Sequence, residues 1–205
     1  GHRIPKEVLE KMNVPCLETK RLILRSFEEG DLRAFYFLLK DEEVNTFLPW
    51  FPVKNMAEAR RFYEERFSVH GNRSPFYCYA VCLKEKNDPI GYITVNLSND
   101  SHDFGYALRK EFWHRGLMTE AGKAVISQLM KDGIAYITAT HDKNNPSSGA
   151  VMRRLGMKYQ YSYEEQCQPK NFLVTFRMYQ LNLDGREDRV YQKYWETSDV
   201  HWIKE

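Results

Sequence analysis

A glycine turn ahead of a predicted helix holds the residues of this sequence that are best suited to binding a ligand. It reads His114-Arg115-Gly116-Leu117-Met118-Thr119, with Glu120 next. The first amides of a helix lack partners within the helix and carry a partial positive charge, so such a turn can bind an anion. Gly116 would let the backbone approach a phosphate closely, and Arg115 can add a charge-assisted contact at the rim.

The turn matches neither of the common nucleotide-binding patterns. It lacks GxGxxG and GxxxxGK[ST], so dinucleotides and nucleoside triphosphates lose their main support as ligands. A single glycine before a helix is more often an ordinary turn than a binding site. The phosphate interpretation therefore depends on the surrounding sequence.

Two histidines invite a metal or catalytic interpretation. His114 and His141 have no partner at ligand spacing, so a surface or hydrogen-bonded role is the better interpretation of both. We expect no metal.

The elements ahead of the turn follow from hydrophobic spacing. Residues 21–25 alternate as a strand does, and a helix over 32–39 can be capped by Asp31. Prolines make residues 47–52 an ordered loop, and Asn55 with Glu58 has the spacing of a capping box at a second helix. Strands over 76–83, 90–97 and 103–108 should be antiparallel neighbours.

The elements after the turn complete the domain. We expect a helix over 119–131 that Gly133 stops, a buried strand over 134–140 and a helix from Pro146. Residues 157–165 and 172–183 predict a long hairpin. The aromatic residues after 186 predict a helical tail docked on the body. This order of elements predicts one α+β domain.

Composition limits the partners. Across 205 residues, 30 basic side chains face 28 acidic ones, and no basic run appears, which disfavours nucleic acid. Four cysteines form no CxxC pair, and no apolar run near the beginning resembles a signal segment, so we expect a reducing cytoplasm. No stretch approaches the ~18 apolar residues of a membrane span, so we expect no membrane partner.

Several short motifs occur together and in one order. They are Thr19-Lys20-Arg21-Leu22-Ile23-Leu24-Arg25, Asp103-Phe104-Gly105-Tyr106, Trp113 to Gly116 with Thr119-Glu120-Ala121, Asn145-Pro146-Ser147-Ser148, and Leu155-Gly156-Met157. This set resembles the Gcn5-related N-acetyltransferase (GNAT) superfamily, in particular its ribosomal-protein alanine and serine N-acetyltransferase branch. The resemblance covers about residues 17–183 and implies a mixed, mostly antiparallel central sheet flanked by helices. The superfamily's usual Q/R-x-x-G-x-G/A loop matches only at Gly116, because Trp113 and Met118 replace its first and last residues.

The resemblance implies acetyl-CoA as the co-substrate. The pyrophosphate would bind the turn at His114, Arg115, Gly116, Leu117, Met118 and Thr119. Backbone near Leu108 would pair with the pantetheine arm and polarise the thioester carbonyl, as an oxyanion hole does. Asn145 would hydrogen-bond the arm, and Ser148 lies in the same cofactor-binding motif.

Two catalytic roles are also implied. Asp103 occupies the strand position where this family often has its base, and burial beside aromatic groups can raise a carboxyl pKa towards neutrality. The alternative is that Asp103 only pairs with a surface cation or caps the turn after His102. Many members use a tyrosine as the general acid at the position where this chain has Met152, so Ser148 is the candidate proton donor to the thiolate. Asn145, Pro146 and Ser148 equally describe an ordinary helix start.

The remaining assignments concern the acceptor and the division of the chain. The acceptor would enter past Phe47 to Phe51 and the hairpin tip at residues 168–171, with Trp50 and Phe51 as walls; such a loop is more often simply core. Glu120 is better explained as a helix-dipole partner or a structural carboxylate.

The chain divides into an extension (1–16) that begins with a tag remnant, an acyltransferase domain (17–183) and a docked tail (184–205). We expect a monomer or homodimer that acetylates a primary amine, either a protein N-terminus or a small molecule. A binding module that senses acyl-CoA without turnover is the alternative.

Overall fold

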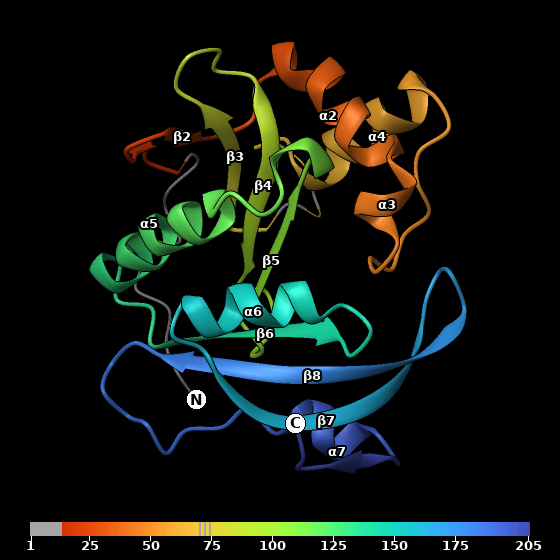
Figure 1. Cartoon of the computed structure of the whole chain (residues 1–205), viewed down its shortest axis with the longest axis vertical. Coiled ribbons are helices and arrows are strands. Elements are labelled where there is room, and N and C mark those ends of the chain that lie inside the picture. Colours follow the sequence, from red (N-terminus) through yellow and green to blue (C-terminus); the bar gives the residue numbers. More distant parts are fainter. Residues whose placement is uncertain (1–13, 70, 72, 74) are drawn as a thin grey trace.

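The computed structural model describes residues 14–69, 71, 73 and 75–205. Within that part of the chain, one nine-stranded sheet has the order β1-β2-β3-β4-β5-β6-β8-β7-β9 (Figure 1). The strands are β1 (Leu17–Glu18), β2 (Leu22–Arg25), β3 (Tyr77–Leu83), β4 (Pro89–Asn96), β5 (Asp103–Leu108), β6 (Tyr136–Asp142), β7 (Lys158–Cys167), β8 (Phe172–Asn182) and β9 (His201–Trp202). The helices are η1 (Glu29–Asp31), α2 (Leu32–Lys40), α3 (Glu42–Asn45), α4 (Met56–Arg66), η2 (Lys110–Phe112), α5 (Leu117–Lys131), α6 (Pro146–Arg154) and α7 (Lys193–Thr197).

Strands β1 to β5 form an antiparallel meander with a core on each face. Alternation along β3 divides its side chains between the two faces: Val81 packs with α5, while Ala80 and Cys82 pack with α2 and α4. In β5, likewise, Leu108 joins the α5 core and Ala107 the other. The predicted antiparallel neighbours and the mixed α+β fold are confirmed.

Strands β5 and β6 diverge to form a fork in the sheet. The two strands are parallel and share one bridging pair, Asp103 with Thr138, among the described residues. In Figure 1, β5 runs nearly vertically and β6 nearly horizontally. Beyond Asp103, no strand of the described chain therefore lies beside the edge of β5 that faces away from β4.

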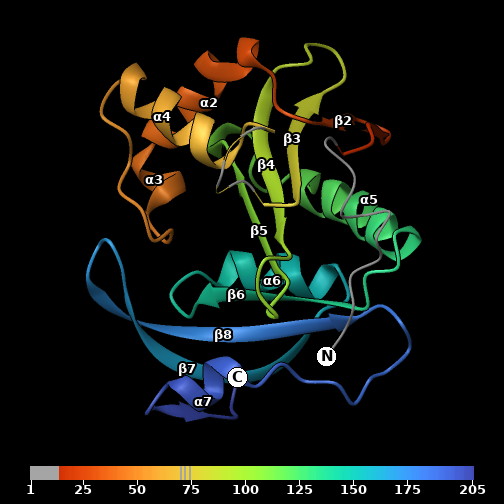
Figure 2. The same ribbon diagram turned by 180° about the vertical axis from the view of Figure 1, so that it is seen from behind.

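The C-terminal half is built on the long hairpin of β7 and β8. Strand β6 pairs along its whole length with residues 176–182 of β8, and the two-residue strand β9 pairs with the outer edge of β7. Figures 1 and 2 both show the hairpin tip rising to α3, where Lys170 Nζ donates to the Asn45 carbonyl at 2.7 Å. The hairpin thus reaches across to the helices of the first half.

Local structure departs from the sequence predictions at four places. Helix α3 and strand β9 were not predicted, and α5 begins at Leu117, two residues earlier than expected. Asp31 precedes α2 but does not cap it with its side chain; its carboxylate accepts from Arg25 at 2.7 and 2.9 Å instead. Asn55 does cap α4, since its side chain accepts from the Glu58 amide at 2.9 Å.

The tail and the first residues complete the comparison. The tail holds only the five-residue helix α7 and then β9, because after Thr197 the chain extends to pair with β7. Most of the predicted extension, residues 1–13, lies outside the described residues. Among the described helices, none combines the length and apolar character that a bilayer crossing requires.

Candidate active site

The glycine turn has the geometry of an anion site. Gly116 adopts a left-handed conformation (φ 74°), in which a side chain would be strained, and it directly precedes α5. The first α-helical bond runs from the Glu120 amide to the Gly116 carbonyl at 3.0 Å, so the three preceding amides have no partner within the helix. Those amides, of Leu117, Met118 and Thr119, belong to residues that line a cavity of about 890 Å³.

The residues of the turn divide between this cavity and the core. Gly116 and His114 line the cavity, and the buried side chains of Leu117 and Met118 also pack into the core under α5. The superfamily's loop usually has a small residue where this chain has Met118. The larger side chain of Met118 is accommodated because it packs into the core. Arg115 does not line the cavity; its guanidinium lies 5.5 Å from the Phe112 ring.

Trp113, at the first motif position, connects the turn to β5. Its indole nitrogen donates to the Leu108 carbonyl at 2.7 Å. The Arg109 amide donates to the Ile90 carbonyl at 2.8 Å on the β4 side. Backbone groups alternate in direction along a strand, so the Leu108 amide points towards the fork. Sequence patterns gave no sign of the Trp113 contact.

A tyrosine and a serine meet across the fork. The Tyr106 hydroxyl of β5 lies 2.7 Å from Ser148 Oγ in the first turn of α6, and it lies 3.0 Å from the Ser148 carbonyl. Met152, where many relatives carry a tyrosine, is buried in the core. Asn145 precedes α6 without a side-chain cap and, like Ser148, lines the cavity. Tyr106 was quoted only as part of a motif, and its partnership with Ser148 was missed.

Asp103 lies where β5 and β6 part, and its side chain lines the same cavity. Burial raises the pKa of Asp103 to about 6. Its charge in turn is among the groups that raise the pKa values of Tyr106, Tyr163 and Tyr194, after burial as the main cause. Within the described chain, neither an ion pair with a surface cation nor a capping hydrogen bond engages this carboxylate.

Glu120 holds the N-terminal strand turn against α5. Its carboxylate accepts from the Thr19 hydroxyl at 2.6 Å and from the Arg21 amide and side chain at 2.9 and 2.8 Å. Burial raises its pKa, but these hydrogen bonds outweigh burial and leave the pKa below its usual range. The carboxylate has the structural role that the sequence favoured.

The two histidines occupy different environments. His114 is exposed at the cavity rim. His141 is buried: its Nδ1 lies 2.8 Å from the Asp142 carbonyl, and burial lowers its pKa. A Cβ added at Gly149 would lie 2.6 Å from His141 Nε2, so Gly149 allows α6 to pack closely on β6. Within the described residues, no cluster of three or more His, Cys, Asp or Glu side chains could hold a metal ion.

The opposite end of the cavity is bounded by the predicted acceptor loop and the hairpin. Phe47 to Trp50 line it, whereas Phe51 does not and is 59% exposed. From β7, Glu165 and Cys167 line it, although the hairpin tip at residues 168–171 does not. Burial raises the pKa of Glu165. This end therefore combines aromatic rings with carboxylates.

The chain as a whole is similar to known acetyltransferases. The model of the acetyltransferase (GNAT) domain matches residues 21–158. The chain belongs to this family. It is 26% identical over 157 residues to the uncharacterized N-acetyltransferase YnaD of Bacillus subtilis, and the alignment covers 75% of this chain and 88% of the relative.

Solved structures of acetyltransferases share this fold. A GNAT-family acetyltransferase from Bacillus anthracis superposes with a TM-score of 0.71 at 22% identity, over 83% of this chain and 99% of that one. The ribosomal-protein acetyltransferase RimL, in complex with coenzyme A, gives a TM-score of 0.70 at 21% identity over the same shares. At these identities the likeness establishes the fold. The prediction of an acetyl-CoA-dependent N-acetyltransferase is confirmed at the level of the family.

Proposed function

We propose that this GNAT enzyme transfers the acetyl group of acetyl-CoA directly to a primary amine, at a protein N-terminus or on a small molecule. The observation that best supports this proposal is that one cavity is lined by the turn before α5 and also by Asp103 at the fork. The cavity therefore has room for a phosphate-bearing donor and an amine acceptor that meet at β5.

The cofactor end would be held mainly by backbone. The amides that begin α5 would bind the pyrophosphate, because they are unpaired and lie at the positive end of the helix dipole. The Leu108 amide points into the fork, where it would hydrogen-bond the pantetheine arm and polarise the thioester carbonyl. Asn145 lines the route between these groups.

The acceptor end would supply the base. An alkylammonium has a pKa of roughly 8 to 10 and is mostly protonated near neutral pH, so a proton must leave before nitrogen can attack. Asp103 would accept this proton directly or through water, since a carboxyl with a pKa of about 6 is a base matched to neutral pH. The amine nitrogen then forms a bond to the thioester carbon, and the carbon–sulfur bond breaks.

Ser148 would return a proton to the departing sulfur. Side chains alternate across a strand, so Tyr106 and Asp103, three residues apart, lie on opposite faces of β5. The Tyr106–Ser148 pair is therefore on the α6 side, while Asp103 faces the acceptor loop. This arrangement would keep the base and the acid on either side of the reacting carbonyl.

The test is a pair of measurements on the purified chain. Calorimetry gives the Kd for acetyl-CoA, and a thiol-release assay follows CoA formation with peptides that begin with Ala or Ser, polyamines, aromatic amines and amino acids. We expect saturable binding and amine-dependent thiol release. Binding without release across the panel would refute acetyl transfer and identify the alternative, an acyl-CoA sensor.

A further inference from the structure

The C-terminal tail lies outside the family match and is firmly attached to the outer edge of the sheet. The family match ends at residue 158, and the tail follows β8. Strand β9 pairs with β7, the Glu164 amide donates to the Val200 carbonyl at 3.0 Å, and Ser198 Oγ donates to the Glu164 carbonyl at 2.7 Å. Figures 1 and 2 show α7 directly against β7.

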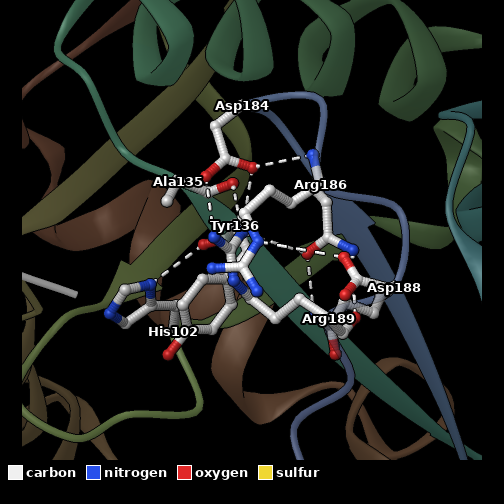
Figure 3. Close-up of polar contacts among 9 residues, drawn as sticks. His102, Ala135, Tyr136, Asp184, Arg186, Asp188 and Arg189 are labelled. Atoms are coloured by element: carbon white, nitrogen blue, oxygen red, sulfur yellow. Dashed lines mark hydrogen bonds and ion pairs between the residues drawn. The ribbon is translucent and has the colours of Figure 1, made fainter. Parts of the chain in front are cut away.

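A second attachment leads towards the fork. Arg189 donates to both oxygens of Asp184, at 3.0 and 2.7 Å, and its guanidinium lies 5.2 Å from the ring centroid of Tyr136 (Figure 3). The Tyr136 ring stacks on His102, with centroids 4.2 Å apart and planes within 15°. His102 directly precedes Asp103 in the chain. The tail is thus anchored on the segment that positions Asp103.

Between these attachments the tail contributes one side chain to the cavity of the active site. Tyr194 of α7 lines that cavity together with Tyr163 and Phe176 of the hairpin. The rings of Tyr194 and Tyr163 stack with centroids 5.0 Å apart and planes within 6°, and Phe176 lies 5.6 Å beyond Tyr163. Asp103 is close enough for its charge to act on both tyrosines.

We propose that the tail completes the acceptor site: Tyr194, stacked on Tyr163, forms the wall against which the substituent next to the acceptor's amine packs. The inference rests on the proposed amine acetylation and adds a residue from the tail that follows β8. Aromatic walls favour apolar or cationic groups. The charges of Asp103 and Glu165 act on both rings, so they repel an anionic group that packs against these rings. The arginines that also line the cavity, Arg66, Arg73 and Arg154, belong to α4, to the segment after it and to the end of α6. The acceptor is therefore a primary amine without an acidic group beside the amine.

The experiment compares Tyr194→Ala with Tyr191→Ala in the full chain. Tyr191 belongs to the same tail, and its ring lies 5.1 Å from that of Tyr194, but it does not line the active-site cavity. The probe is the best amine of the thiol-release panel. We expect Tyr194→Ala to raise the KM for this amine about tenfold, in line with loss of an aromatic contact. The Kd for acetyl-CoA stays within about twofold, and Tyr191→Ala changes neither constant by more than that.

Two further readouts keep the test decisive. Tyr194→Leu retains apolar packing on Tyr163 and replaces Tyr194→Ala if the alanine variant unfolds; the same rise in amine KM is expected. In the wild type, amines without a neighbouring carboxylate should be preferred over matched amino acids. An unchanged amine KM, equal effects of the Tyr194 and Tyr191 variants, or a preference for acidic amines would overturn the proposal. A wild type that acetylates no amine would instead refute the proposed function, before any variant is compared.

Discussion

At the scale of single residues, Asp103 has the environment that a base for an ammonium acceptor requires. Its pKa of about 6 results from burial, and no described cation neutralises it. Among the surrounding groups, burial raises the pKa values of Tyr106, Tyr163 and Tyr194, and it lowers the pKa of His141. Glu165 is the other carboxyl in the cavity with a raised pKa.

We therefore expect Asp103→Asn to remove the acidic limb of the pH–rate profile. The base must be deprotonated, so the wild-type rate should rise through about pH 6 and level off above it. The variant should lose about 10²- to 10⁴-fold in kcat, as loss of a positioned base does. Steady-state rates between pH 5 and 8 measure this. Glu165→Gln is the control, and a limb that disappears in this variant but stays in Asp103→Asn would assign the base to Glu165.

The same substitution has an opposite effect on stability. A carboxyl whose pKa is higher in the fold than in the unfolded chain binds its proton more tightly when folded, so stability falls as pH rises from about 4 to about 6. At pH 7, Asp103→Asn should raise the free energy of unfolding by about 1 to 3 kcal/mol. Urea unfolding at pH 7 and pH 4 tests the sign, since the gain should shrink at the lower pH.

Tyr106→Phe tests whether the hydroxyl of Ser148 must be held in place. When Tyr106 donates to Ser148 Oγ, the serine proton is free to reach the leaving sulfur. Without the phenol, kcat should fall about three- to tenfold, the value of one hydrogen bond, with acetyl-CoA affinity unchanged. Acetyl thioesters of more acidic thiols should reduce the deficit, because they need less help from an acid.

Tyr159→Phe is the matched control for this prediction. It breaks an equivalent tyrosine–serine pair, in which the Tyr159 hydroxyl lies 2.7 Å from Ser162 Oγ, away from the active-site cavity. We expect its kcat to match the wild type. Equal losses in the two variants, or a Tyr106→Phe deficit that ignores the leaving thiol, would leave Tyr106 with a purely structural role.

At the scale of elements, the Glu120 carboxylate fixes the start of α5 against the β1–β2 turn. Glu120→Gln should lower the free energy of unfolding by about 1 to 2 kcal/mol, because charge-assisted hydrogen bonds from Thr19 and Arg21 are lost. The loss is no larger because Arg21 is partly exposed and solvent screens its charge. Its depressed pKa means that this stabilisation is present at neutral pH and is lost as pH falls through the folded-state pKa.

Urea unfolding of Glu120→Gln and Glu111→Gln separates this contact from ordinary surface pairing. Glu111 forms a comparable close pair with Arg109, at 2.6 Å, on the surface. Its variant should change stability by less than about 0.5 kcal/mol. If both variants behave alike, the motif residues Thr19, Arg21 and Glu120 do not form a stabilising unit.

Sequence patterns predicted elements well where a local signal was complete. Strand-forming residues between turns placed β5 at its observed bounds, and Asn55 identified the start of α4. They failed where distant residues decide the outcome: Asp31 binds Arg25 rather than capping α2, and β9 forms by pairing with the outer edge of β7. At the candidate site, the motifs pointed to the turn and to Ser148, which line one cavity. The contacts made by Trp113, Tyr106 and Tyr194 depend on the folded arrangement.

At the scale of the whole molecule, a ligand bound at the fork would contribute to the stability of the fold. Among the described residues, the meander and the C-terminal strands are joined through one β5–β6 bridging pair, through packing, and through hydrogen bonds such as those of Tyr106 with Ser148 and of Lys170 with Asn45. A ligand that binds the α5 turn, the Leu108 amide and the start of α6 would bridge both sides of the fork. Ligand binding to the folded state alone stabilises it by about 2.7 kcal/mol at a concentration 100 times the Kd.

Acetyl-CoA at that concentration should therefore raise the Tm by about 5 to 10 °C for a domain of this size. Gly116→Glu should abolish the shift, because the new carboxylate would repel a phosphate at the start of α5. The left-handed backbone of this residue would also be strained by a side chain. Gly185→Glu is the control: it imposes the same backbone strain (φ 84°), with no atom within 4 Å of the new Cβ. The Tm of the wild type and of both variants is measured by thermal unfolding with and without acetyl-CoA. A full shift in Gly116→Glu would mean that the ligand binds elsewhere. A shift lost in both variants would mean that weakened folding, rather than a blocked site, removes it.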